Sequence, residues 1–372
     1  MISTVALPAS AAMDYLSSTA AISTASSADT TTIDTVQTVA GTSDQLPTPS
    51  PESWFYTRDV EGGVEITGFD TKASGFNGNI VVPKTINDKK VVSIADGTED
   101  NFSDWVPIYG AYDVCSLDLS YCDGITIGEY AFGQTAFLHL VDTPYRGCSN
   151  LKSLTLPEGA TIGKGAFALS GLISVSDMSN CTINDAAFLH CKDLESVGDL
   201  NNCQIGQQAF DTCKKLASVG DMSTCTFIGD KAFYHCQNLE SIGNLNNCQI
   251  GDQAFDTCTN LKSIDNMSNC TVNTKAFYHC ENLKSIGDLT NSKIGQQAFD
   301  TCTNLTTVGD MSTCSYIGNK AFYHCENLES INNLSSCTSI GTQAFDSCKN
   351  LKSIGNMSNC TVNTKAFYQC EN

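Results

Sequence analysis

Apolar residues return along this chain at a nearly constant spacing. The pair Ala-Phe recurs with its phenylalanine every 21 to 23 residues. These phenylalanines are Phe167, Phe188, Phe210, Phe233, Phe255, Phe277, Phe299, Phe322, Phe345 and Phe367. Between two such pairs a second set of apolar positions repeats, as in Cys236, Leu239, Ile242, Leu245, Cys248 and Ile250. A period of this length predicts a stack of small repeated units in place of one large core.

The spacing within a unit follows the leucine-rich-repeat pattern L-x-x-L-x-L-x-x-N/C-x-L, with one residue inserted before the third apolar position. A unit of about 22 residues cannot bury its own apolar face, whereas stacked units share a continuous core. The sequence therefore predicts a leucine-rich-repeat solenoid of stacked short parallel β-strands, joined by irregular, 3-10 or short helical returns. In such a stack the phenylalanines form one buried ladder.

The inserted residue is often glycine beside Asp or Asn, as in Gly220-Asp221. We interpret it as a bulge or turn that bends the chain out of a strand, with Asp and Asn making turns. The residue after Phe alternates between Asp and Tyr, so two units form a longer repeat of about 45 residues. The alternating residues are Asp211, Tyr234, Asp256, Tyr278, Asp300, Tyr323, Asp346 and Tyr368.

Three segments are expected. Residues 1–51 are rich in Ser, Thr and Ala and predict a disordered leader, or a signal remnant near the start. Residues 52–110 have strand-like patterns around Glu61-Gly62-Gly63 and predict an N-terminal β cap. Residues 111–372 hold the repeat array of about 10–11 turns. Because no polar cap follows the last unit, we expect the array to be truncated at its C-terminal end.

The repeated units resemble those of the BspA-like leucine-rich-repeat proteins. The resemblance rests on Ile-Gly…Ala-Phe…Cys…Leu-x-Ser-Val/Ile units, such as Ile205-Gly206…Ala209-Phe210…Cys213, and covers roughly residues 60 to 372. It implies a leucine-rich-repeat fold and a surface-exposed role, since the family includes microbial surface antigens and adhesins that contact host proteins. This chain departs from the family by its Gly-Asp/Asn insertion and its second Cys per unit. The family shares no ligand-contact motif that could be carried over.

The net charge of the chain indicates which classes of binding partner are expected. The net charge is −20, from 40 acidic and 20 basic side chains, and Lys and Arg form no cluster larger than a pair. A nucleic-acid partner is therefore not expected, because polyanion binding needs clustered Lys and Arg. No apolar run reaches the roughly 18–20 residues that span a bilayer, so no membrane span is expected in this chain.

The cysteines form two ladders, one three residues after each Phe and one near the Asn position of the repeat, where Ser292 fills one slot. Paired Cys-x2-4-Cys knuckles of a zinc site are absent. Equivalent cysteines on adjacent turns have parallel Cβ vectors, which is poor geometry for a disulfide. We therefore predict buried thiols. Cys115, Cys122 and Cys148 lie outside the ladders, and one disulfide among them is conceivable.

Four histidines, His190, His235, His279 and His324, each precede a ladder cysteine. They lie two turns apart, about 10 Å, which is too far to share a metal ion. A catalytic His–Cys pair would need a third, orienting group. We also find no G-x-S-x-G, P-loop, H-E-x-x-H or dinucleotide motif. We expect no catalytic, cofactor-binding or metal-binding residue, and we interpret the histidines as surface or packing residues.

The tyrosine stripe formed by Tyr234, Tyr278, Tyr323 and Tyr368 is the candidate partner-binding surface. The alternative is that each ring lies half-buried against its neighbouring turn. Our hypothesis is a non-enzymatic cell-surface or secreted recognition or adhesion protein. Its partner would be a protein, such as a host matrix or cell-surface protein, and a glycan is a second type of ligand. The alternatives are a cytoplasmic protein-interaction scaffold and the targeting module of a larger enzyme.

Overall fold

The computed structural model describes residues 47–99, 105–134 and 147–371. The chain divides into two units, Met1–Gln45 and Leu46–Asn372, and the fold described below belongs to the second. Most of the predicted leader lies outside the described residues. Its last residues are in contact with the array, because Ser50 N–H donates to Val81 O at 2.8 Å and the Tyr121 hydroxyl donates to Pro47 O at 3.0 Å.

The N-terminal part of this unit is built on an antiparallel hairpin. The 3-10 helix η1 (Glu52–Trp54) leads into β1 (Phe55–Val60), which pairs with β2 (Gly63–Phe69). Strand β2 pairs in parallel with β5 (Lys89–Ile94), so the hairpin continues directly into the array. The remaining elements here are β4 (Thr85–Ile86), β6 (Thr98–Glu99), β7 (Trp105–Val106) and η2 (Ala111–Asp113).

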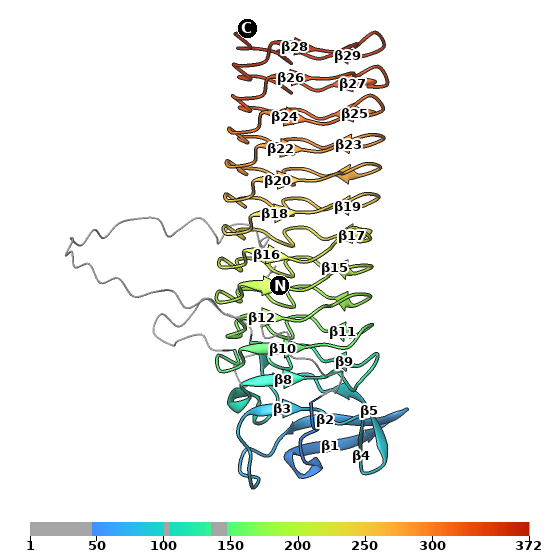
Figure 1. The fold of residues 1–372 in the computed structure, drawn as a ribbon, viewed down its shortest axis with the longest axis vertical. Coiled ribbons are helices and arrows are strands. Elements are labelled where there is room, and N and C mark those ends of the chain that lie inside the picture. The colour runs from blue at the N-terminus through green and yellow to red at the C-terminus, as the bar shows by residue number, and fades with distance from the viewer. Residues whose placement is uncertain (1–46, 100–104, 135–146, 372) are drawn as a thin grey trace, which may run out of the picture. The chain divides into compact units, whose positions relative to one another are not determined.

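Each coil of the array contributes two short strands, which stack into two columns (Figure 1). The first column contains β3 (Asn79–Val81), β8 (Ser116–Asp118), β10 (Ser153–Thr155), β12 (Ser174–Val175), β14 (Ser196–Val197), β16 (Ser218–Val219), β18 (Ser241–Ile242), β20 (Ser263–Ile264), β22 (Ser285–Ile286), β24 (Thr307–Val308), β26 (Ser330–Ile331) and β28 (Ser353–Ile354). The second follows β5 with β9 (Thr126–Ile127), β11 (Thr161–Ile162), β13 (Thr182–Ile183), β15 (Gln204–Ile205), β17 (Phe227–Ile228), β19 (Gln249–Ile250), β21 (Thr271–Val272), β23 (Lys293–Ile294), β25 (Tyr316–Ile317), β27 (Ser339–Ile340) and β29 (Thr361–Val362).

The strands within each column are parallel and in register. Ser263 lies opposite Ser285, and Ile250 lies opposite Val272 in the other column. The second column is continuous from β5 to β29, while the first is hydrogen-bonded in three runs, β3 to β16, β18 to β24 and β26 to β28. The predicted solenoid of stacked short parallel strands is confirmed. The returns that carry the Ala-Phe pairs are consecutive turns.

The phenylalanines of the Ala-Phe pairs form a single stacked ladder in the core. From Phe132 to Phe367, neighbouring ring centroids lie 5.0–5.4 Å apart with interplanar angles of 1–14°. Backbone bonds follow the same ladder, since Phe233 N–H donates to Ala254 O and Phe255 N–H donates to Ala276 O, each at 2.7 Å. The rings and the turns that carry them are therefore fixed by the next coil along the chain.

The glycines that follow the first-column strands allow adjacent coils to pack closely. A Cβ at Gly220 would lie 2.6 Å from Asp199 N and 2.7 Å from Gly198 C, which leaves no space for it. The neighbouring acidic side chains bridge coils, and we had expected them to make turns. Asp199 Oδ1 accepts the N–H of Asp221 at 2.8 Å, and Asp288 Oδ1 accepts that of Asp310 at the same distance. Some also make the expected turns, as where Asp221 Oδ1 accepts Ser223 N–H at 2.9 Å.

The ladder cysteines are free thiols that point into the core, in agreement with the sequence analysis. Each thiol of the first ladder contacts the Phe carbonyl one coil back, as Cys258 Sγ does with Phe233 O at 3.2 Å. In the second ladder Ser292 replaces cysteine and donates to Met267 O at 2.6 Å. Cys115, Cys122 and Cys148 are also free, and only Cys115 of these is exposed. The conceivable disulfide among them is therefore absent.

Truncating one ring in the middle of the ladder should destabilise the array strongly. We expect Phe255→Ala to lower the free energy of unfolding by about 3–5 kcal/mol, because the ring is fully buried between two others. The matched control is Phe227→Ala, whose ring is 40% exposed and should cost about 0.5 kcal/mol or less. Urea unfolding measures both. Equal effects of the two variants would contradict the ring ladder as the centre of the core.

The buried thiols should make the array sensitive to alkali. Burial raises the pKa of Cys225 and of Cys270 from 9.0 to about 11. Because this pKa is raised in the folded state, the protonated thiol contributes its full stabilisation of the fold below pH 9, near the unfolded-state pKa. That stabilisation is lost as the pH rises from 9 towards 11. Urea unfolding at pH 8 and 10.5 should show this loss. Cys225→Ser, which follows the natural Ser292, should reduce it, whereas a pH-independent stability would contradict the prediction.

Candidate functional site

Two kinds of return turn alternate along the second half of the array. One reads Lys-Ala-Phe-Tyr-His-Cys, as in Lys275–Cys280, and the other reads Gln-Ala-Phe-Asp-Thr/Ser-Cys, as in Gln253–Cys258. Ala, Phe and Cys point into the core, so the remaining positions determine how the surfaces of the two turns differ. This alternation produces a surface that repeats every two coils.

The first kind of turn forms a compact triad of side chains. The Tyr278 and His279 rings stack with centroids 4.0 Å apart, and Lys275 Nζ lies 4.8 Å from the Tyr278 ring centroid. The same arrangement recurs with Tyr–His distances of 4.0–4.1 Å and Lys–Tyr distances of 4.7–5.4 Å. We call these side chains the Lys–Tyr–His strip: Lys231, Tyr234, His235, Lys275, Tyr278, His279, Lys320, Tyr323, His324, Lys365 and Tyr368.

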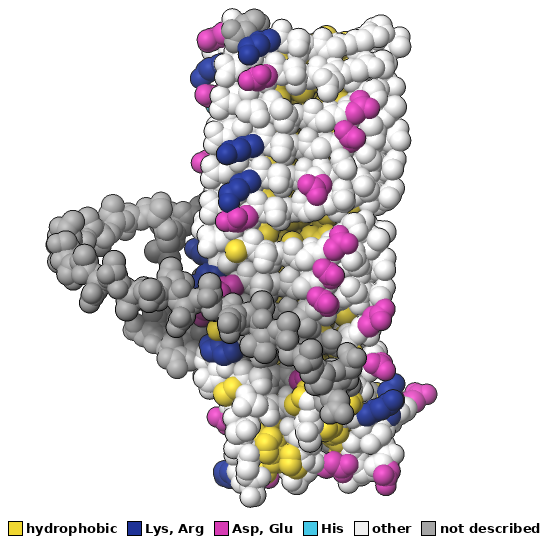
Figure 2. Space-filling view, in the orientation of Figure 1, with side chains coloured by type: hydrophobic (Ala, Val, Ile, Leu, Met, Phe, Trp, Pro, Cys, Tyr) yellow, Lys and Arg dark blue, Asp and Glu magenta, His cyan; other side chains and the backbone are white. Residues whose placement is uncertain are grey.

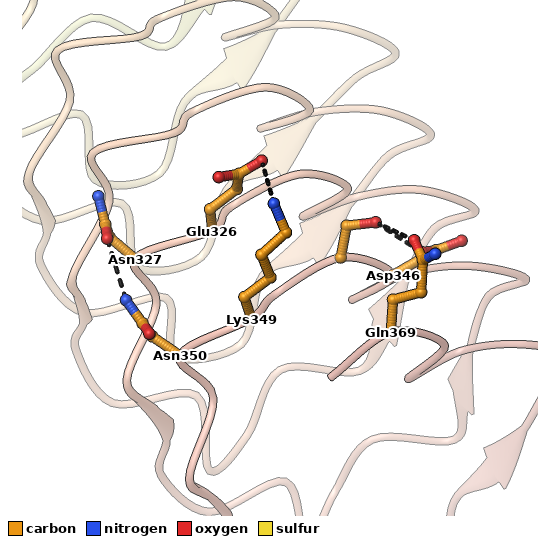
Figure 3. A network of polar contacts seen from close by, with 7 residues as sticks. Glu326, Asn327, Asp346, Lys349, Asn350 and Gln369 are labelled. Carbon is orange, nitrogen blue, oxygen red and sulfur yellow. Dashed lines mark hydrogen bonds and ion pairs between the residues drawn. The ribbon is translucent and has the colours of Figure 1, made fainter. Parts of the chain in front are cut away.

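The second kind of turn buries a carboxylate. The four aspartates Asp211, Asp256, Asp300 and Asp346 are only 2–4% exposed. For each aspartate, the side-chain N–H of the glutamine three residues before it donates to one carboxylate oxygen at 2.7–3.0 Å. The following Thr or Ser hydroxyl donates to the other at 2.7–2.9 Å. Figure 3 shows Asp346 beside Gln369, whose Oε1 accepts a hydrogen bond from the Ser347 hydroxyl at 3.0 Å.

The two kinds of turn are joined to each other. His279 N–H donates to Asp300 O at 3.0 Å, and Thr257 N–H donates to Tyr278 O at 2.8 Å. Burial raises the pKa of the Tyr278 hydroxyl, and the carboxylates of Asp300 and Asp256 raise it further. The tyrosine therefore stays protonated and can donate a hydrogen bond. Each complete triad therefore lies between two aspartate-bearing turns, whose backbone groups form hydrogen bonds with its own backbone.

The lysines and histidines of the strip occupy an unfavourable backbone conformation. Lys275 has φ 57° and His279 has φ 56°, in the left-handed region, and the equivalent residues of the other coils have similar values. A non-glycine residue there costs roughly 1–2 kcal/mol. Gly165 fills the lysine position in an earlier coil with φ 60°. Ala186 and Gln253 also take this position, with φ 55° and 56°, so the left-handed conformation is common to the coils and does not by itself select lysine.

The structure brings the four predicted tyrosines onto one strip, adds a lysine to each, and adds a histidine to Tyr234, Tyr278 and Tyr323. Tyr234, Tyr278 and Tyr323 are half-buried, and Tyr368 is 51% exposed. His235, His279 and His324 pack on the tyrosine rings, which fits their interpretation as surface or packing residues. Sequence reasoning found the alternation with aspartate but missed that the aspartates are buried. The signal was available, because each is flanked by Gln three residues before and Thr or Ser one residue after.

The face that carries the strands has a different character. Figure 2 shows Lys and Arg along one edge of this face with Asp and Glu among them, and a further column of Asp and Glu nearer the opposite edge, with no histidine visible. Ion pairs tie adjacent coils together, such as Lys215–Asp193 and Lys262–Glu240, each at 2.8 Å. Figure 3 shows another such pair, Glu326–Lys349, beside the amide pair Asn327–Asn350. These contacts are exposed and belong to the stacking of coils.

Potential metal ligands are not clustered in the part of the chain that the structure describes. No group of three His, Cys, Asp or Glu side chains in residues 47–99, 105–134 and 147–371 could hold a metal ion. Over the same ranges, no helix combines the length and the apolarity needed to cross a bilayer. The histidines and ladder cysteines point to different environments, since Cys280 is buried while His279 packs on Tyr278.

Comparison with known protein families identifies the repeat. The sequence profile described as BspA type leucine rich repeat region, in six copies, matches residues 125–195, 181–287 and 271–372. These matches together cover more than half of the chain. No match was found among curated proteins.

Solved structures of bacterial repeat proteins are similar to this chain. A leucine-rich repeat protein from Bacteroides ovatus is 23% identical, with a TM-score of 0.46 over 88% of this chain and 92% of that one. One from Eubacterium ventriosum is 18% identical, with a TM-score of 0.41 over 77% and 90%. A leucine rich cell surface protein from Faecalibacterium prausnitzii is 16% identical, with a TM-score of 0.31 over 87% and 97%. Likenesses this distant carry no argument about function.

The histidines predict a loss of stability in mild acid. Burial lowers the pKa of His190 and His235, although the carboxylate of Asp211 opposes this in both. A lowered folded-state pKa means that stabilisation is present above about 6.5, the unfolded value, and is lost as the pH falls below it. The control is the double variant His190→Gln/His235→Gln, since Gln369 takes the same position in the last coil. Urea unfolding between pH 7 and 5 should show a smaller loss for the variant, and identical profiles would contradict the prediction.

Proposed function

Because this chain belongs to the BspA type leucine-rich-repeat family, we propose that it is a non-enzymatic recognition protein, at the cell surface or secreted, that binds a protein partner through its repeat surface. The partner class includes host matrix and cell-surface proteins, and glycans are the second class of ligand to test. The Lys–Tyr–His strip is the proposed binding surface.

One observation supports this surface above the others. Each lysine and histidine is placed against a tyrosine, which restricts the ring before a partner arrives. A ring that is already fixed loses less conformational entropy on binding. Tyrosine is also among the residues that most often anchor protein interfaces.

A second candidate function is an intracellular protein-interaction scaffold. It is favoured by the thiols, since all 20 cysteines of the chain are free. Disulfides form in oxidising compartments and are rare in the cytosol. The same strip would serve as the binding surface in both settings. Cell fractionation separates them, because an exclusively cytosolic protein would exclude the surface-exposed role.

The strip can be tested directly by surface plasmon resonance. Immobilised full-length chain is exposed to purified matrix and cell-surface proteins and to glycans. For a bound protein, we expect Tyr278→Ala/Tyr323→Ala to weaken affinity by about tenfold or more, since one anchor residue is typically worth over 1 kcal/mol. The matched control is Tyr316→Ala, because Tyr316 is 41% exposed but lies in the strand column. Binding that is unchanged in the double variant, or lost equally in the control, would contradict the proposal.

A further inference from the structure

The strip has a regular spacing that restricts what can lie along it. The coils carrying Tyr234 and Tyr278 are separated by two steps of the phenylalanine ladder, each 5.0 Å. The next two intervals consist of steps of 5.2 Å and 5.2–5.3 Å. The triads therefore repeat at roughly 10 Å in a straight line. A partner that contacts several triads in the same way must present the same group at nearly this interval on one of its faces.

The chemistry of the strip is that of a hydrogen-bond donor. Each complete triad offers the Lys ammonium and a His ring N–H. Burial, with the carboxylates of Asp300 and Asp256, raises the pKa of the Tyr278 hydroxyl, which therefore stays a donor. The acceptors nearby are used internally, because both oxygens of Asp256 and of Asp300 already accept from Gln and Thr side chains. A matching partner therefore supplies acceptors, about one for every 10 Å along its length.

Polypeptide conformations differ in how well they meet this demand. A β-strand presents the same face every two residues, about 6.7 Å, which does not fit the spacing. An α-helix repeats a face after about 10.5 Å, but its backbone carbonyls are used within the helix. A polyproline II helix repeats its face every three residues, about 9.3 Å, and its carbonyls have no internal partners. Both its period and its free acceptors fit the strip.

We propose that the Lys–Tyr–His strip binds a proline-rich segment in the polyproline II conformation, lying along the array. Proline rings pack against the exposed parts of the Tyr and His rings, and backbone carbonyls accept from Lys and His. Proline-rich ligands are bound by aromatic side chains elsewhere in the same manner. The two periods differ by about 1 Å per repeat, so the offset reaches about 3 Å over the three intervals of the strip, which flexible lysine side chains can absorb. This inference rests on the proposed function of the strip.

Fluorescence anisotropy of a labelled, end-capped oligoproline added to the full-length chain tests the proposal. Peptides of about six, nine and twelve residues should bind with affinity that rises at each added helical turn. The comparison ligands are a helical peptide of Glu-Ala-Ala-Ala-Lys repeats and a β-linked chito-oligosaccharide. We expect the longest oligoproline to bind at least tenfold more tightly than either. Absence of oligoproline binding, or a preference for the helix or the glycan, would overturn the proposal.

Variants locate the binding on the strip. Tyr278→Ala/Tyr323→Ala should weaken oligoproline binding at least tenfold, while Tyr316→Ala should leave it unchanged. Tyr278→Phe/Tyr323→Phe keeps the rings and guards against a folding defect; it should bind more tightly than the alanine variant. Binding that ignores both tyrosines would overturn the proposal. If the alanine variant loses a globular protein partner while oligoproline fails to bind, only the polyproline inference falls. If no ligand depends on the tyrosines, the proposed function falls with it.

Discussion

Stacking of each coil on the next, in register, is the constraint on which the rest of this structure depends. A coil of this size has no interior of its own, and its phenylalanine is buried because a neighbouring ring covers each face. The backbone also depends on the neighbouring coil, since the Phe N–H donates to a carbonyl oxygen of the following coil. Burial and hydrogen bonding are therefore both supplied by neighbours, and the geometry of one step is copied along the whole array.

Because the same step repeats from coil to coil, equivalent residues form columns along the array. The side chains of each column must be packed or hydrogen-bonded in the same way in every coil. Thiols contact the Phe carbonyls one coil back, so a small polarisable group fills the core without leaving an unmatched polar atom. Asp and Asn of the turns accept N–H groups of the next coil. On the outer surface the alternation of Tyr and Asp gives a repeat of two coils. The surface is therefore periodic because the core is periodic.

The sequence was sufficient for the fold because the apolar period is strict. The Ala-Phe spacing predicted the solenoid, and the parallel Cβ vectors of Cys258 and its equivalents predicted free thiols. The second strand column was not predicted, since Ile250 was recognised only as an apolar position of the repeat. A two-residue strand has no periodicity of its own, and only pairing with the next coil defines it. The coil-bridging role of Asp199 was missed for the same reason, because that contact joins residues 22 apart in the chain.

Of the candidate site, the tyrosines could be found from sequence, and the flanking Gln and Thr or Ser gave a signal for the buried aspartates, but the triads could not be predicted. Left-handed backbone at Lys275 and His279 folds both side chains onto Tyr278, and no propensity scale predicts such a conformation for them. The most direct measurement of the central claim is native-state hydrogen exchange of the Phe backbone amides. Coupled coils predict slow exchange at Phe255, in mid-array, and faster exchange at Phe345, near the last coil. Exchange at Phe255 as fast as at exposed turn amides would contradict the account.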